Sequence, residues 1–263
     1  MKLPIYQVDA FTDKLFGGNP AAVIPLIKWI DESQMQKIAM ENNLADTAFF
    51  VAKGEEFEIR WFTPVAEINL CGHATLATAF VLYSILGYNK PSITFNSKSG
   101  ALVVSKSSNL FSMNFPSWMP EQTDDYPEGL KEMLGVNEIF AVYKHRDLLV
   151  LLNNEDDVKN AAPDFFKIKK TGLKIIITAP GKEVDFVSRF FSPANGIDED
   201  PVTGSAHVQL TPLWSKRLNK KNMQARQLSA RGGFLQVAQN GDRVTIAGNA
   251  VFYMKGEIDL HEL

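Results

Sequence analysis

Residues 57–64 read Phe-Glu-Ile-Arg-Trp-Phe-Thr-Pro, and residues 186–193 read Phe-Val-Ser-Arg-Phe-Phe-Ser-Pro. Phe, Arg, Phe and Pro recur at the same places, and two further positions are close substitutions. Each octapeptide leads through an acidic stretch into Gly-x-Ala, at Gly72 and Gly204, where a helix is predicted to begin. The second connector is longer by three residues. This repeat predicts two similar halves, each a curved sheet around a mostly apolar helix, with a site in the cleft between them.

Short runs rich in β-branched and aromatic residues dominate the rest of the chain. Helices are predicted over Thr75–Leu86 and Ala206–Leu218, with a short peripheral one near Glu128–Leu134. A further helix is predicted after Asp31, which forms a capping-box pattern with Gln34. Strands are predicted at residues 4–10, 21–27, 47–52, 57–63, 92–96, 101–105, 148–152, 173–179, 184–191, 224–229, 234–238, 244–246 and 251–255. Strands outnumber helices and rarely alternate with them, which favours an α+β fold over a doubly wound parallel sheet.

Composition is typical of a water-soluble globular protein, with 263 residues, 45% hydrophobic, 22% charged and a net charge of −3. No nucleic-acid partner is expected, because there is no basic excess. No membrane association is expected either, because the longest nearly uncharged run, 68–88, is too polar for a spanning helix. The N-terminus carries no signal-peptide pattern, so we expect a cytoplasmic protein. A single cysteine, Cys71, excludes a disulfide framework and a cysteine-cluster metal site.

The two predicted helix starts are candidate anion sites. A glycine followed by small residues lets backbone N–H groups approach a ligand, and the helix dipole favours an anion there by about 0.3–1 kcal/mol. Two such starts facing one cleft would hold a carboxylate or a developing enolate. For either start alone, tight packing of a central helix explains the glycine as well.

His73 stands at the first helix start, beside Cys71. An imidazole there suits a proton relay, although a lone histidine is more often buried and bonded to backbone. A thiolate base at Cys71 is a further alternative, since a helix N-terminus lowers a thiol pKa. The second half lacks a matching cysteine, which excludes a symmetric two-thiol mechanism. No histidine pair has helical ligand spacing, so no metal is predicted.

Five carboxylates lie near these segments: Asp46, Glu67, Asp198, Glu199 and Asp200. Glu67 and Glu199 each precede their glycine by five residues, a symmetry that indicates a structural role such as capping. Asp200 lies before Pro201 on the approach to the second helix, and Asp46 comes from a separate segment before a strand. One carboxylate from each half could take a proton from one carbon and return it to another.

Five motifs occur in order and cover essentially the whole chain: DAFTDKLFGGNPAAV (9–23), NNLADTAFF (42–50), RWFTPVAEINLCGHATLATA (60–79), SRFFSPANGIDEDPVTGSAH (188–207) and QLSARGG (227–233). With these motifs the chain resembles the phenazine-biosynthesis-like PhzF family, relatives of diaminopimelate epimerase. The resemblance implies two pseudo-symmetric domains, each an antiparallel barrel-like sheet around a central helix. The N-terminal domain, 1–116, takes back the last strand, 252–263, and the C-terminal domain is 117–251.

Family members act without metal or organic cofactor, and the founding member is a homodimeric isomerase. It moves a proton between carbons of a dihydro-hydroxyanthranilate ring. The resemblance therefore implies an isomerase of a small carboxylate-bearing substrate, and a homodimer.

Site residues follow from the motifs position by position. Asp46 stands where the family has its catalytic Glu, while His73 and Asp200 match the other proton-handling positions. The implied substrate contacts are Gly72, Ala74, Gly204, Ser205 and, from Gly18-Asn19-Pro20, Asn19.

The catalytic segment departs from the family pattern. Asp46 is one methylene shorter than Glu, and Ala45 replaces a serine. A carboxylate withdrawn by about 1 Å can lose about 100-fold in rate when geometry is tight. Three consequences are open: the protein acts on a different or larger substrate, a backbone shift restores the position of the Asp46 carboxylate, or activity on family substrates is weak. The alternatives in function are a silent ligand-binding homologue and an amino-acid racemase or epimerase, which normally needs two matched bases.

Overall fold

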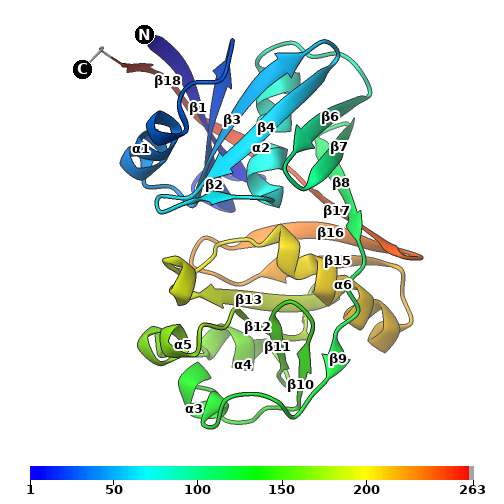
Figure 1. The fold of residues 1–263 in the computed structure, drawn as a ribbon. Helices are drawn as coiled ribbons and strands as arrows, with labels where there is room; N and C mark the ends of the chain where they lie inside the picture. Colours follow the sequence, from blue (N-terminus) through cyan, green and yellow to red (C-terminus); the bar gives the residue numbers. More distant parts are fainter. Residues whose placement is uncertain (261–263) are drawn as a thin grey trace. The chain divides into compact units, whose positions relative to one another are not determined.

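The computed structural model describes residues 1–260, which form two compact units (Figure 1). Unit 1 comprises Met1–Asn114 and the C-terminal segment from Ala247, and unit 2 comprises Phe115–Ile246. The domain boundaries implied by the family resemblance remain a prediction. Among the described residues, no helix combines the length and apolar character needed to cross a membrane.

Unit 1 contains a mostly antiparallel sheet. Its helices are α1 (Glu32–Asn42) and α2 (Gly72–Ser84). Its strands are β1 (Lys2–Ala10), β2 (Asn19–Leu26), β3 (Asp46–Lys53), β4 (Glu56–Phe62), β5 (Glu67–Ile68), β6 (Ser92–Ser97), β7 (Gly100–Ser107), β8 (Leu110–Pro116, which runs into unit 2) and β18 (Ala250–Asp259). The pairs β2–β3 and β4–β6 are parallel, and β1 pairs with the returning strand β18.

Helix α2 is the central helix of unit 1. It packs against β1, β2 and β3, and its residues from His73 to Ala79 are all buried (Figure 1). A helix that is apolar on every side is stable only when other elements surround it. The helix predicted over Thr75–Leu86 is therefore present and begins three residues earlier.

Unit 2 repeats the plan and adds short helices. Its helices are α3 (Leu130–Leu134), α4 (Glu155–Asn160), α5 (Phe165–Thr171), α6 (Gly204–Leu218) and the 3-10 helix η1 (Pro193–Asn195). Its strands are β9 (Glu121–Gln122), β10 (Ala141–Lys144), β11 (Leu148–Leu151), β12 (Ile175–Pro180), β13 (Phe186–Ser192), β14 (Ile197–Glu199), β15 (Asn222–Gln227), β16 (Gly233–Asn240) and β17 (Arg243–Gly248, which runs into unit 1).

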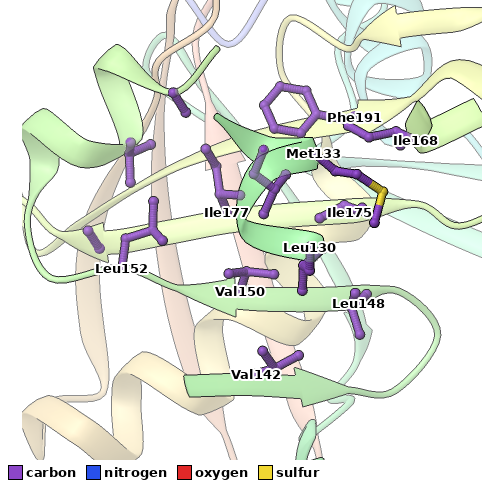
Figure 2. Packing of buried hydrophobic residues seen from close by; sticks show 14 of the residues in the cluster. Leu130, Met133, Val142, Leu148, Val150, Leu152, Ile168, Ile175, Ile177 and Phe191 are labelled. Carbon is purple, nitrogen blue, oxygen red and sulfur yellow. The ribbon is translucent and has the colours of Figure 1, made fainter. Parts of the chain in front are cut away.

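The core of unit 2 lies on both faces of β12. On one face, Ile175 and Ile177 pack with Val150 of β11 and with Leu130 of α3 (Figure 2). On the other face, Thr178 accepts a 3.0 Å hydrogen bond from the indole of Trp214 in α6. Because both faces are covered, β12 is a continuous apolar run rather than an alternating one.

The strand pairing of the two units confirms the internal repeat. In unit 1, β2–β3 is parallel, β3–β4 antiparallel, β4–β6 parallel and β6–β7 antiparallel. In unit 2, β11–β12, β12–β13, β13–β15 and β15–β16 follow the same order of directions. The α+β fold with two pseudo-symmetric halves is confirmed, and each mostly antiparallel sheet includes two parallel pairs.

One predicted detail of α1 is wrong. Asp31 is the N-cap residue, but its side chain makes no capping hydrogen bond. The helix ends at Asn42, and its C-cap residue Asn43 has the left-handed conformation.

Candidate active site

Each octapeptide contains an arginine that pairs with the glutamate five residues before the helix glycine. Arg60 binds Glu67 through two hydrogen bonds of 2.7 Å, and Arg189 binds Glu199 through bonds of 2.7 and 2.8 Å. Hydrogen bonding to Arg60 holds the pKa of Glu67 below its usual value. The two symmetric glutamates therefore hold the approach to each helix by pairing with arginine, not by capping.

The start of α2 places two reactive side chains next to each other. Cys71 is the N-cap residue with extended backbone, and its carbonyl accepts a hydrogen bond of 2.5 Å from Thr75 Oγ1. Gly72 opens the helix and His73 follows it. The change from extended to helical backbone at Gly72 directs Cys71 Sγ to within 3.4 Å of His73 Nδ1.

Asp46 completes a buried polar cluster with these two residues. Its Oδ2 lies 3.2 Å from Cys71 Sγ and 3.5 Å from His73 Nε2. Asp46 is the first residue of β3, where pairing with Ala21 of β2 fixes its backbone. Each of the three cluster residues is 5% exposed. The carboxylate, thiol and imidazole are thus held in one largely desolvated place within unit 1.

Asn19 sets the orientation of the imidazole. Its Nδ2 lies 3.3 Å from His73 Nδ1, and the residue is fully buried at the start of β2. Burial lowers the pKa of His73 to about 3, so the ring is neutral near pH 7. A donor at Asn19 Nδ2 favours the neutral tautomer in which Nδ1 accepts and the Nε2–H faces Asp46.

The same cluster has the donor atoms of a metal site. One ligand atom from each of Asp46, Cys71 and His73 lies within 4.8 Å of the others. Carboxylate, thiolate and neutral imidazole are ligands that Zn²⁺ accepts. No metal was predicted from the sequence. Asp46 lies 25 residues before Cys71, and the packing of β2, β3 and α2 brings the ligand atoms together.

Asp200 lies in a comparable network at the start of α6. Thr203, the N-cap residue of α6, donates a short hydrogen bond from its hydroxyl to Asp200 Oδ2. Gln227 Nε2 donates to the Asp200 carbonyl at 2.7 Å, and its Oε1 accepts from the Thr203 N–H at 2.9 Å. Thr203 occupies the position of Cys71 in the repeat, immediately before the glycine. In each unit, the residue just before the helix therefore contacts a carboxylate: Cys71 contacts Asp46, and Thr203 contacts Asp200.

Sequence reasoning missed three residues next to Ser205. Arg146 Nη2 donates to Ser205 Oγ at 3.1 Å and also forms a two-point ion pair with Asp147. Gln209, on the next turn of α6, donates to Asp147 Oδ2 at 2.9 Å. An Arg-Asp pair directly before the apolar strand 148–151 was the only signal, and it does not reveal its partners in α6.

The predicted site residues thus fall into two groups. Asp46, His73 and Asn19 come together in unit 1. Asp200 and Ser205 lie at the start of α6 in unit 2, and their contribution to one reaction remains a prediction. The predicted substrate contacts at the helix starts differ in exposure. Gly72 is half-buried, whereas Ala74 and Gly204 are buried, and all three remain predictions as contacts.

Solved structures with the same fold define the class of protein. The PhzF-family protein of Enterococcus faecalis superimposes with a TM-score of 0.95 at 47% identity, over 99% of this chain and 100% of that one. A hydroxyproline epimerase of Agrobacterium vitis shares the fold alone, with a TM-score of 0.61 at 9% identity, over 98% of this chain and 92% of that one. The chain therefore has the epimerase-like fold of two related halves.

Sequence comparison gives the family. The family described as phenazine biosynthesis-like protein (PhzC-PhzF) matches residues 8–256. A Pseudomonas aeruginosa protein named as an uncharacterized isomerase is 46% identical over 261 residues, covering 99% of this chain and all of that protein. A mouse phenazine biosynthesis-like domain-containing protein is 39% identical over 286 residues, covering 98% and 99%. The chain belongs to the phenazine biosynthesis-like PhzC-PhzF family.

Proposed function

We propose that the chain is a cofactor-independent isomerase that moves a proton on a small carboxylate-bearing substrate. Family membership and relatives named as isomerases support the isomerase class. The observation that carries the chemistry is the buried cluster in which Cys71 and His73 both contact Asp46 Oδ2. The proposal also includes cytoplasmic residence and a homodimer, as the family resemblance implies.

In the proposed reaction, Asp46 removes a proton from a carbon conjugated to an unsaturated system. The electron pair of the broken C–H bond delocalises into that system, and a new C–H bond forms at another carbon. No electrons leave the substrate, so no redox partner is required. His73, together with Asp200, relays or returns the proton, while the helix starts at Gly72 and Gly204 hold the developing anion.

The neighbours of Asp46 suit this role. A thiol and a neutral imidazole N–H are hydrogen-bond donors toward a carboxylate and add no fixed positive charge. These two contacts therefore help to hold the carboxylate in position. General acid–base catalysis by a positioned group contributes typically about 10²–10⁴-fold in rate.

A two-base racemase receives less support from the chain. The position of Cys71 in the repeat is taken in unit 2 by Thr203, whose hydroxyl is a poor base. A silent ligand-binding protein remains the alternative that the experiment must separate.

Deuterium wash-in from D2O tests the proposal on a panel of cyclic and amino carboxylates. Wild-type protein should exchange carbon-bound protons of at least one of them, and Asp46→Asn should abolish the exchange. Asp31→Asn is the matched control, because Asp31 is exposed and its side chain makes no capping bond. Ligand binding without exchange, unaffected by Asp46→Asn, would identify a silent binder and overturn the proposal.

A further inference from the structure

Arg146 is held rigidly beside the start of α6. Asp147, which is 2% exposed, accepts a hydrogen bond from Arg146 Nε at 2.9 Å and a second one from Arg146 Nη2. The guanidinium lies 5.4 Å from the ring centre of Trp118. Fully buried Gln209 fixes Asp147 in turn, donating to its carboxylate and accepting from its N–H at 3.3 Å. An arginine side chain normally loses much rotational freedom on binding a ligand, and here that loss has already occurred.

Each unit has a side-chain contact to the second residue of its central helix. In unit 1, Asn19 at the start of β2 contacts His73, the second residue of α2. In unit 2, Arg146 just before β11 contacts Ser205, the second residue of α6. The strand register matches Asn19 with His145, so Arg146 is not the counterpart of Asn19 in the repeat. A guanidinium beside the second helix residue is therefore a feature of unit 2.

We propose that Arg146, beside the Ser205 contact that the family motif implies, binds the carboxylate of the substrate and sets the preference for an anion. This assignment rests on the proposed function and adds the side chains that recognise the charged group. Asp147 and Ser205 engage Nε and Nη2, and among the described residues no acceptor contacts Nη1. The Arg146 side chain is 33% exposed, so its Nη1 edge can reach a ligand. A planar guanidinium suits a carboxylate better than an ammonium does.

Asp147 does not cancel this role. Its carboxylate accepts hydrogen bonds from both Arg146 and the Gln209 amide, so the guanidinium does not supply all of them. The competing explanation is a structural tie that fastens the β10–β11 turn to α6. A tie would affect stability and would treat charged and uncharged ligands alike. A carboxylate anchor would distinguish between them.

The test uses a pair of probes that differ only in charge. Anthranilate carries the ring and carboxylate of the substrate type implied by the family resemblance, and anthranilamide replaces the carboxylate with a neutral amide. Binding of each is measured by isothermal titration to wild-type protein, Arg146→Gln, Arg146→Lys and Ser205→Ala. Lys144→Gln is the control, because Lys144 ends β10 two residues before Arg146 and pairs with the exposed Asp125.

Arg146→Gln should raise the Kd of anthranilate at least 10-fold and leave that of anthranilamide unchanged. Arg146→Lys should recover only part of the loss, Ser205→Ala should show a smaller selective loss, and Lys144→Gln should match wild type. Equal affinities in wild type and Arg146→Gln would overturn the proposal. An equal loss for both probes, or no binding of anthranilate to wild-type protein at 10 mM, would overturn it as well. If Arg146→Gln is unfolded, Arg146→Lys and Ser205→Ala decide by the same criterion.

Failure here is distinguishable from failure of the proposed function. A silent binder would keep the charge preference at Arg146 and show no deuterium exchange. An active isomerase with a different anchor would show exchange that depends on Asp46, yet bind anthranilate equally with and without Arg146.

Discussion

Burial of a neutral His73 should make the stability of the protein fall steeply in mild acid. Its pKa is lowered to about 3 by burial among Asp46, Cys71 and Asn19, whereas an unfolded histidine titrates near 6.5. Between these values the unfolded chain binds one more proton than the folded protein. Stability contributed by the neutral ring is therefore fully present above about pH 6.5 and is lost as the pH falls toward 3. From pH 8 to pH 4.5 the loss is about 2–3 kcal/mol for this residue.

Urea unfolding at several pH values between 8 and 4.5 measures this effect. His73→Gln cannot take up the proton, so its free energy of unfolding should fall by about 2–3 kcal/mol less than that of wild type over this range. Comparing the pH slopes, rather than the stabilities at one pH, removes the constant effect of the substitution. His145→Gln is the control, because His145 is exposed, and it should follow wild type. Parallel pH profiles for wild type and His73→Gln would refute the account of a buried neutral imidazole.

Three further predictions concern the site and its support. Asp46→Glu should slow deuterium exchange about 100-fold, because the longer side chain cannot keep its carboxylate 3.2 Å from Cys71 Sγ; an unchanged rate would show that the site is not tuned to Asp. Arg189→Ala should lower the free energy of urea unfolding by about 3 kcal/mol, since it leaves Glu199 without its ion-pair partner. Lys182→Ala, which removes an exposed ion pair, should change that free energy by less than about 0.5 kcal/mol. Similar small effects for both variants would contradict a stabilising role of the Arg189–Glu199 pair. Exchange should survive dialysis against EDTA, and added Zn²⁺ should inhibit wild type more than Cys71→Ser; loss of activity in EDTA would overturn the metal-free mechanism.

The two-halved fold could be predicted from the sequence because the repeated segments contain the same aromatic, Arg and Pro residues at the same spacing. The two octapeptides became β4 and β13, and both central helices begin at the expected glycines. Some elements were not predicted, among them β8, α4 and α5. Helix α4, Glu155–Asn160, contributes Val158 to the core, so its sequence lacks apolar residues repeated at helical spacing.

The candidate site was predictable only in part. Asp46 and His73 could be assigned through the family motifs, but their distance from each other and from Cys71 depends on how β3 packs beside α2. Arg146 was missed for the same reason, since its support comes from Gln209 through a bond between residues 62 positions apart. Contacts across such separations are set by tertiary packing, and one sequence gives no local pattern for them.

The rate of deuterium wash-in to the best substrate of the panel tests the central claim most directly. Wild type, Asp46→Asn and Asp31→Asn are compared at pH 7.5 under identical protein concentration, with the folded state of each checked by circular dichroism. If Asp46 removes the proton, Asp46→Asn should lose at least about 100-fold in exchange rate, at the lower end of what general acid–base catalysis contributes, while Asp31→Asn keeps the wild-type rate. Exchange by a folded Asp46→Asn protein at the wild-type rate would contradict the assignment of Asp46 as the proton-abstracting base.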